Sequence, residues 1–415
     1  MSARCYGRAL GFPSLPDEEM VSLNRRLGNV LNEEGVFFMN QATALVKNLS
    51  DEDTADVSAS TLRAAETLLE RSREFMNQGI ALFQKIDDNA NIALLLSNSG
   101  RLWRIAGHIK SLTRERNKHE FGSAEKDEYK RALSEYQKAL KTLGNRKMNP
   151  SVWDSVTYEL CCTFFTVGTL FQDQAPLSSL SREDAEKQVI EFFLKALMYC
   201  DIDTVSSRQD LYRRRAAEIH LRLASLYHHS YRSFDIEDTS FRKKKLKQLS
   251  ENHYCKAAPL YLQQERFVYY LRCVLEKGAL LEAQLDSLTS PGAKQKQFFL
   301  ILSCLLETRP ALEQMSSGSD TDTQTVPSSE KVESSSTKLE DEIEEEIYVT
   351  NTLLQRVQAT LLSLYKLLMG KTPKKGKEPS PLVNKFKELY AESLKTKNIA
   401  FEILNLLNKI QEANP

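Results

Sequence analysis

The sequence predicts an all-α fold, in which helical hairpins stack as an α-solenoid and a further helical hairpin follows at the C-terminus. Three observations favour this class. Only 15 Gly and 12 Pro occur in 415 residues, which indicates long uninterrupted helices. Apolar residues recur at spacings of three and four, as they do on one face of a helix. A frame of small and bulky residues also returns about every 60 positions.

The composition is ordinary for a soluble chain, with 41% hydrophobic and 27% charged residues. Its 56 Lys and Arg balance 56 Asp and Glu, so it lacks the positive excess of proteins that coat nucleic acid. Seven scattered cysteines indicate free thiols in a reducing compartment. Residues 1–16 lack an export signal, and no run of about 18 apolar residues predicts a membrane span. We therefore expect a nuclear or a cytoplasmic protein.

The repeating unit is clearest in its second helix. There a small, a bulky and a small residue are spaced by four and three, which is typical of a tetratricopeptide repeat. Small residues let a neighbouring helix approach closely, and the bulky residue fills the space between hairpins. The central positions are 60, 57 and 61 residues apart. The sets are Ser72, Met76 and Gly79, which is the weakest; Ala132, Tyr136 and Ala139; Val189, Phe193 and Ala196; and Ser250, Tyr254 and Ala257.

First helices lie upstream of each frame and carry large, small and large residues at the same spacings. These sets are Leu31, Gly35 and Phe38; Leu96, Gly100 and Trp103; Tyr158, Cys162 and Phe165; and His220, Ala224 and Tyr227. The period exceeds the usual ~34 residues, so we expect expanded hairpins with longer helices. Members of both frames are predicted to pack the repeats together, namely Gly35, Gly100, Trp103, Ala132, Tyr136, Ala139, Phe193, Ala196, Ala224, Tyr227, Tyr254 and Ala257.

Residues 1–20 are predicted to be a flexible N-terminus and residues 21–315 to be the solenoid. Helix starts are predicted at Asn149, which precedes a proline, and at Ser181, which opens a capping box; Gly144 predicts a helix end. Two apolar periodic segments, 267–288 and 298–312, predict a fifth hairpin that has lost the small-residue frame.

Residues 316–338 hold eight Ser, four Thr and no aromatic residue, which predicts a disordered linker. Residues 339–415 are predicted to form the C-terminal helical hairpin, with a Lys/Pro-rich loop at 371–381. Its first helix has an apolar face at Leu339, Ile343, Ile347, Leu354, Val357, Leu361, Leu364 and Leu368. The single last helix carries Val383, Phe386, Leu389, Ile403, Leu406 and Ile410. This hairpin either docks on the solenoid end or pairs with another chain.

Four stretches of this sequence carry a resemblance to a known family. They are RRLGNVLNEEGVFFMNQA at 25–42, LLLSNSGRLWRI at 94–105, PSVWDS at 150–155 and IHLRLASLYH at 219–228. They resemble the tetratricopeptide-bearing C-terminal part of the erythroid differentiation-related factor 1 family. The likeness covers about residues 20–265, while the tail resembles the family only in its order of helices and a polar insert.

The resemblance implies a nuclear regulator of gene expression associated with erythroid differentiation, and it implies no enzyme activity. Members of that family are much longer chains with a large N-terminal region. This sequence is therefore expected to be a fragment or a short form.

Catalytic motifs are absent from the sequence: it has no phosphate loop, dinucleotide-binding turn, nucleophile elbow or HExxH helix. Adjacent Cys161 and Cys162 would point about 100° apart on a helix, which favours packing thiols over a zinc clamp. His220, His228 and His229, facing His253 and Cys255, are interpreted as core or groove histidines rather than as a metal cluster. We predict no enzyme, no cofactor and no metal.

The more specific functional hypothesis is a groove that binds a partner protein. In tetratricopeptide arrays the first helices line the concave side, where the candidates are Asn32, Arg101, Arg104, Thr163, Ser225 and His228. The two arginines are suited to bidentate binding of a partner's carboxylate. The alternative is that they pair with acidic side chains of the next hairpin.

The basic run at 242–247 and the lysines of the 371–381 loop favour either recognition by nuclear import machinery or a solvated surface. Aromatic residues do not interleave with them in sequence, which argues against direct nucleic-acid contact. Two functions are open: a scaffold that binds other proteins and regulates transcription, or an oligomerisation module of a larger cytosolic complex that self-associates through residues 339–415.

Overall fold

The computed structural model describes residues 2–11, 16–49, 55–116, 120–235, 240–318, 333–370 and 380–413. Every regular element in these ranges is a helix, and consecutive helices pack side by side as hairpins. The predicted all-α solenoid of helical hairpins is confirmed. The chain divides into two compact units, Met1–Tyr212 and Arg213–Pro415, which we call the N-terminal and C-terminal units.

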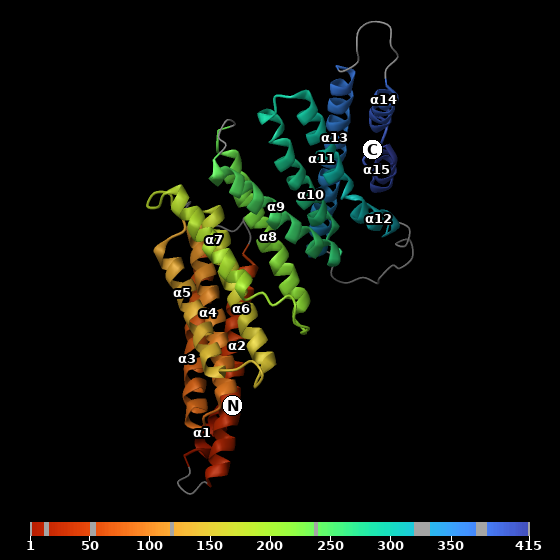
Figure 1. Cartoon of the computed structure of the whole chain (residues 1–415). Helices are drawn as coiled ribbons and strands as arrows, with labels where there is room; N and C mark the ends of the chain where they lie inside the picture. The colour runs from red at the N-terminus through yellow and green to blue at the C-terminus, as the bar shows by residue number, and fades with distance from the viewer. Residues whose placement is uncertain are drawn as a thin grey trace. The chain divides into compact units, whose positions relative to one another are not determined.

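The N-terminal unit consists of three hairpins preceded by a short helix (Figure 1). α2 packs on α3, α4 on α5 and α6 on α7, and the first helices also touch one another, α2 against α4 and α4 against α6. The first helices therefore form a continuous row. The bounds are α1 (Ser2–Ala9), α2 (Asp17–Lys47), α3 (Ala55–Lys85), α4 (Asn89–Arg116), α5 (Ser123–Leu143), α6 (Pro150–Asp173) and α7 (Arg182–Met198).

Close packing within each hairpin depends on a small residue that faces a bulky one. A Cβ on Gly100 would lie 2.6 Å from the ring of Tyr136, whose side chain is fully buried. Gly35 faces Met76 in the first hairpin, with 3.1 Å to the nearest side-chain atom. The small residues of the first helices thus sit against the central residues of the second-helix frames, so the helix backbones can come close together.

Local signals explain several helix ends. Ser181 caps α7, because its hydroxyl accepts a hydrogen bond from the Asp184 N–H at 3.1 Å. Gly144 ends α5 with a φ of +69°, a backbone conformation that side chains disfavour. α6 begins at Pro150, although the side chain of Asn149 makes no capping hydrogen bond. Proline alone provides this start, since its fixed φ suits the first helical position.

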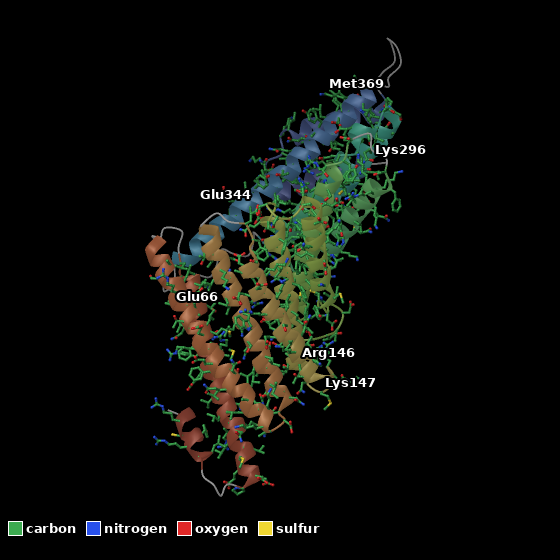
Figure 2. All side chains as sticks on the ribbon, turned by 90° about the vertical axis from the view of Figure 1, so that its left-hand side faces the viewer. Glu66, Arg146, Lys147, Lys296, Glu344 and Met369 are labelled. Atoms are coloured by element: carbon green, nitrogen blue, oxygen red, sulfur yellow. The ribbon has the colours of Figure 1, made fainter. Side chains whose placement is uncertain are left out.

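A salt-bridge cluster closes the third hairpin. Arg146, in the connection between α5 and α6 (Figure 2), lies 2.8 Å from the Asp154 carboxylate at the start of α6. Its guanidinium also lies 2.7 Å from Asp201, just beyond α7. The same arginine therefore holds both ends of the hairpin.

The C-terminal unit begins inside α8 and continues through the last helix. In the α8–α9 hairpin, the Ser250 hydroxyl donates to the carbonyl of Ala224 at 3.0 Å. The bounds are α8 (Gln209–Arg232), α9 (Phe241–Gln263), α10 (Phe267–Glu282), the 3-10 helix η1 (Leu285–Ser287), α11 (Pro291–Leu306), α12 (Arg309–Gly318), α13 (Glu333–Met369), α14 (Pro381–Ser393) and α15 (Ala400–Ala413).

The C-terminal segment differs from the predicted two-helix hairpin, because the last helix is split into α14 and α15. The break is held by polar contacts: the Asn398 amide donates to the Ile347 carbonyl at 3.0 Å, and the Lys397 N–H donates to Glu402 at 2.7 Å. α13 packs on α10, α11 and α14, and α15 packs on α12. Figure 2 shows Met369, at the end of α13, and Lys296, near the start of α11, towards the same end of this unit.

Two other predicted segments are partly helical. In the range 1–20, predicted to be a flexible N-terminus, α1 contacts α2 with Tyr6 and Leu10 half-buried, and α2 begins at Asp17. Helices extend into the predicted linker 316–338 from both sides, since α12 ends at Gly318 and α13 begins at Glu333. The rest of that linker, 319–332, and most of the 371–381 loop lie outside the described residues.

Candidate functional site

The predicted groove residues of the N-terminal unit connect consecutive first helices. The Asn98 side chain on α4 donates to the Asn32 side chain on α2 at 2.8 Å. The Arg104 guanidinium on α4 lies 2.8 Å from the Glu159 carboxylate on α6, and that of Arg101 lies 3.8 Å from the same carboxylate. These polar pairs run between neighbouring hairpins and fix their register.

The two arginines differ in how strongly they are held. Burial opposes the charge of Arg104, yet Tyr136 and Glu159 beside it raise the pKa of the guanidinium. Burial also raises the pKa of Tyr136, so the phenol beside this ion pair stays neutral. Arg101 is the more exposed of the pair, at 38% of its side chain. Glu159 of the next hairpin thus already pairs with both arginines, as the alternative to a partner-binding groove predicts.

Two of the groove candidates do not face solvent. Thr163 is fully buried and donates its hydroxyl to the carbonyl of Glu159, one turn earlier, at 2.8 Å. His228 is also buried, with its Nδ1 3.3 Å from the Tyr254 hydroxyl. Ser225 is exposed on α8. Placing Thr163 and His228 on an open groove is therefore wrong, because both point into the packing between helices.

The histidines form a pair and not a larger cluster. His220 and His253 meet across the α8–α9 hairpin, with 2.8 Å between their Nδ1 atoms. Burial lowers the pKa of His220 to about 3 and that of His253 to about 4. Across the described ranges no three His, Cys, Asp or Glu side chains are grouped so that they could hold a metal ion. The pair serves packing as neutral rings.

None of the seven cysteines, all of which lie in the described ranges, forms a disulfide. The sulfur of Cys161 lies 3.1 Å from that of Cys200, at the end of the third hairpin. Burial raises the pKa of Cys273 and of Cys304 to about 12, so these two thiols remain protonated and unreactive at neutral pH.

The basic run at 242–247 forms the first turns of α9 and has aromatic neighbours that the sequence pattern did not reveal. The Arg242 guanidinium lies 5.7 Å from the ring centre of Phe234, and the Lys243 ammonium lies 5.6 Å from that of Tyr231. These aromatic residues come from the end of α8 and the segment after it. They precede the run by several residues, so no local interleaving marks them.

An apolar surface on the C-terminal unit was also missed. Ile343 and Ile347, assigned by their spacing to the buried face of α13, are instead exposed on its first half. The hydrogen bond between Asn398 and the Ile347 carbonyl brings the α14–α15 turn beside them. We call the exposed side chains of these two segments the C-terminal apolar patch; each is 51–67% exposed, and they are Ile343, Ile347, Tyr348, Leu394, Ile399 and Phe401.

Comparison with protein families covers nearly the whole chain. A family described as "Erythroid differentiation-related factor 1-like, TPR repeats" matches residues 23–413. The chain belongs to this family. The match includes the C-terminal helices, so the tail belongs to the erythroid differentiation-related factor 1-like repeat region together with the hairpins.

Named members of the family are similar in sequence and much longer. Erythroid differentiation-related factor 1 of Homo sapiens is 41% identical over 320 residues, and that of Mus musculus is 40% identical over the same length. These alignments cover 75% of this chain and 25% of each relative. The chain therefore spans about a quarter of the length of these curated relatives.

Among solved structures, a circular tandem repeat protein with novel repeat topology and enhanced subunit contact surfaces aligns with 100% of this chain and 99% of its own. At 12% identity and a TM-score of 0.29, the likeness carries no argument. No helix within the described residues has the length and apolar character needed to cross a membrane.

Proposed function

We propose that this chain is a non-enzymatic scaffold that binds other proteins and takes part, in the nucleus, in transcriptional regulation linked to erythroid differentiation. Family membership carries the proposal, since tetratricopeptide repeats generally mediate protein–protein interactions. The name of the relatives supports the link with erythroid differentiation. All-helical repeat folds of this kind typically bind other chains and do not catalyse reactions.

The C-terminal apolar patch supports partner binding through the C-terminal unit. Its side chains are large, lie on two adjoining segments, and are more than half exposed. Large exposed apolar side chains on adjoining segments mark interaction sites, because water solvates them poorly. Arg101 and Arg104 give weaker support for partner binding, because both already pair with Glu159.

Partner capture from nuclear extract tests this proposal. The tagged chain is compared with a double variant, Ile347→Glu with Phe401→Glu, and the captured proteins are identified by mass spectrometry. We expect the double variant to lose specific partners, because two carboxylates would be desolvated at the interface. Leu300→Glu on α11 is the matched control, since Leu300 is 55% exposed and lies outside the patch.

Unchanged capture by the double variant would remove the patch from the proposal. A chain found only in the cytosolic fraction of erythroid cells, by immunoblotting, would contradict the nuclear part.

The second candidate is an oligomerisation module of a larger cytosolic complex, and the position of the patch within residues 339–415 favours it specifically. Light scattering separates the two functions. If the parent chain is a dimer and the same double variant is a monomer, the patch joins two copies of this chain. A monomeric parent with partner capture that depends on the patch supports the scaffold.

A further inference from the structure

A cavity of about 680 Å³ lies in the C-terminal unit where the end of α8, the start of α9 and the end of α10 meet. Tyr231 and Phe234 line it from the α8 side, and Ala279, Ala283 and Leu288 line it from α10 and the turn that follows. Its wall is therefore mixed, with apolar surface beside polar groups. A cavity of this size accommodates a few side chains of a peptide.

Positive charge dominates the lining of this cavity. Among the described lining residues, Arg232, three lysines of α9 and Arg356 of α13 carry positive charge, and Glu282 and Asp286 carry negative charge. Burial raises the pKa of Glu282, while the charge of Arg356 beside it opposes that rise. Since the whole sequence has a net charge of zero, this excess is a local concentration of cations.

Neutral acceptors hold several of these cations in place. The Lys243 ammonium donates to the Asp235 carbonyl at 2.5 Å, and that of Lys247 donates to the Gln284 side-chain oxygen at 2.7 Å. The Arg356 guanidinium donates to the Leu275 carbonyl at 2.6 Å. Acidic groups pair with two of these cations as well, since Arg356 lies 3.7 Å from the Glu282 carboxylate and Lys247 lies 3.8 Å from that of Glu251. Arg232 and Lys244 line the cavity beside these pairs, so positive charge still exceeds negative charge among the described lining residues.

We infer that this cavity binds a segment of a partner protein in which Asp or Glu residues alternate with aliphatic ones. The inference rests on the proposed scaffold function and names a partner chemistry for a second surface of the same unit. Carboxylates would meet the lysines and arginines, and aliphatic side chains would contact Ala283 and Leu288. Nucleic acid fits less well, because cations already cover the rings of Tyr231 and Phe234 that bases would stack on.

Fluorescence anisotropy tests the inference with a labelled peptide of alternating Glu and Leu and a matched peptide in which Gln replaces Glu. The charge reversals Arg232→Glu and Lys244→Glu are combined in one variant, since both side chains are exposed and line the cavity. We expect this variant to bind the Glu peptide at least about tenfold more weakly than the parent chain. Lys245→Glu is the control, because Lys245 is exposed on the same turn of α9 but does not line the cavity.

Three results would overturn the inference: equal binding of the Glu and Gln peptides, an equal loss with Lys245→Glu, or tighter binding of a single-stranded oligonucleotide than of the Glu peptide. Circular dichroism of each variant checks that the helices persist. The scaffold function fails separately, when the parent chain captures no proteins from nuclear extract. Capture that persists alongside failed peptide binding removes only the cavity.

Discussion

At the scale of single residues, the hairpins depend on positions where a side chain cannot be added. Gly28 faces the ring of Phe83 and Gly168 faces that of Phe193, and an added Cβ would lie 2.6 Å and 2.8 Å from those rings. Contacts this short require the aromatic ring or a helix backbone to move. The size of the side chain at these positions therefore limits stability more directly than its hydrophobicity does.

Gly100→Ala is expected to destabilise the N-terminal unit by about 1–3 kcal/mol, because the new methyl group would overlap the Tyr136 ring. Urea unfolding followed by circular dichroism measures the change. Gly278→Ala is the matched substitution in the other unit, where the nearest atom is 3.7 Å away. It is expected to be neutral or stabilising by up to about 1 kcal/mol. Equal effects of the two substitutions would contradict the packing.

The buried histidine pair makes stability depend on pH. His220 and His253 have folded-state pKa values of about 3 and 4, below their usual 6.5. As pH falls below about 6.5, the unfolded chain binds protons that the folded chain does not, so the free energy of unfolding decreases. Urea unfolding between about pH 7.5 and 5.5 should show this loss.

Replacing both His220 and His253 by Gln should reduce that pH dependence, and part of it should remain because burial also lowers the pKa of His228 to about 4. The third buried histidine provides a comparison, since His228→Gln should remove a smaller part of the slope than the double variant does. An identical slope in the double variant would assign the pH dependence to other groups.

At the scale of the element, the same kind of hydrogen bond ties the two helices together within each of two hairpins, α2–α3 and α8–α9. The Ser72 hydroxyl on α3 donates to the Gly35 carbonyl at 2.7 Å, and Ser250 on α9 makes the equivalent bond to Ala224. Both serines occupy the first position of the second-helix frame. The middle hairpins have Ala132 and Val189 there, so they lack the hydroxyl and rely on packing alone.

Ser250→Ala should destabilise the C-terminal unit by about 1 kcal/mol, the usual net contribution of a buried hydrogen bond. Thermal unfolding measures it, with Ser225→Ala on the exposed side of α8 as the control. If both variants melt at the temperature of the parent, the serine bond contributes nothing to the hairpin.

The hairpins were predictable from sequence because their packing is encoded at short spacings, as at Tyr136 and Ala139 on α5. The break between α14 and α15 was not, since it depends on Asn398 reaching Ile347, 51 residues away in the chain. The candidate functional site was harder to predict from sequence than the fold. Arg104 lies on the first helix α4, and its pairing with Glu159 depends on how two hairpins meet.

At the scale of the whole molecule, one apolar core runs through the C-terminal unit. It joins Leu271 of α10 and Ile301 of α11 to Leu353 of α13, Phe386 of α14 and Leu407 of α15. All five side chains are fully buried. The last three helices are therefore part of the unit, and the buried face of α13 is covered within the chain.

Removal of residues 339–415 should consequently expose the apolar faces of α10 and α11. We expect the shortened chain to bind a hydrophobic dye, to scatter light as aggregates and to unfold less cooperatively. Ile347→Glu, which alters only exposed surface, should change the free energy of unfolding by no more than about 0.5 kcal/mol. A shortened chain that stays monomeric and melts like the parent would be incompatible with the shared core.

The covering of α10 and α11 by the final helices also limits what can be added to the repeat stack. A row of hairpins that ends on a bare apolar face invites the next copy to join there, and repeated joining produces filaments. α13, α14 and α15 cover that apolar face, since their own apolar side chains belong to the same buried core. Growth of this kind through the apolar faces of α10 and α11 is therefore disfavoured.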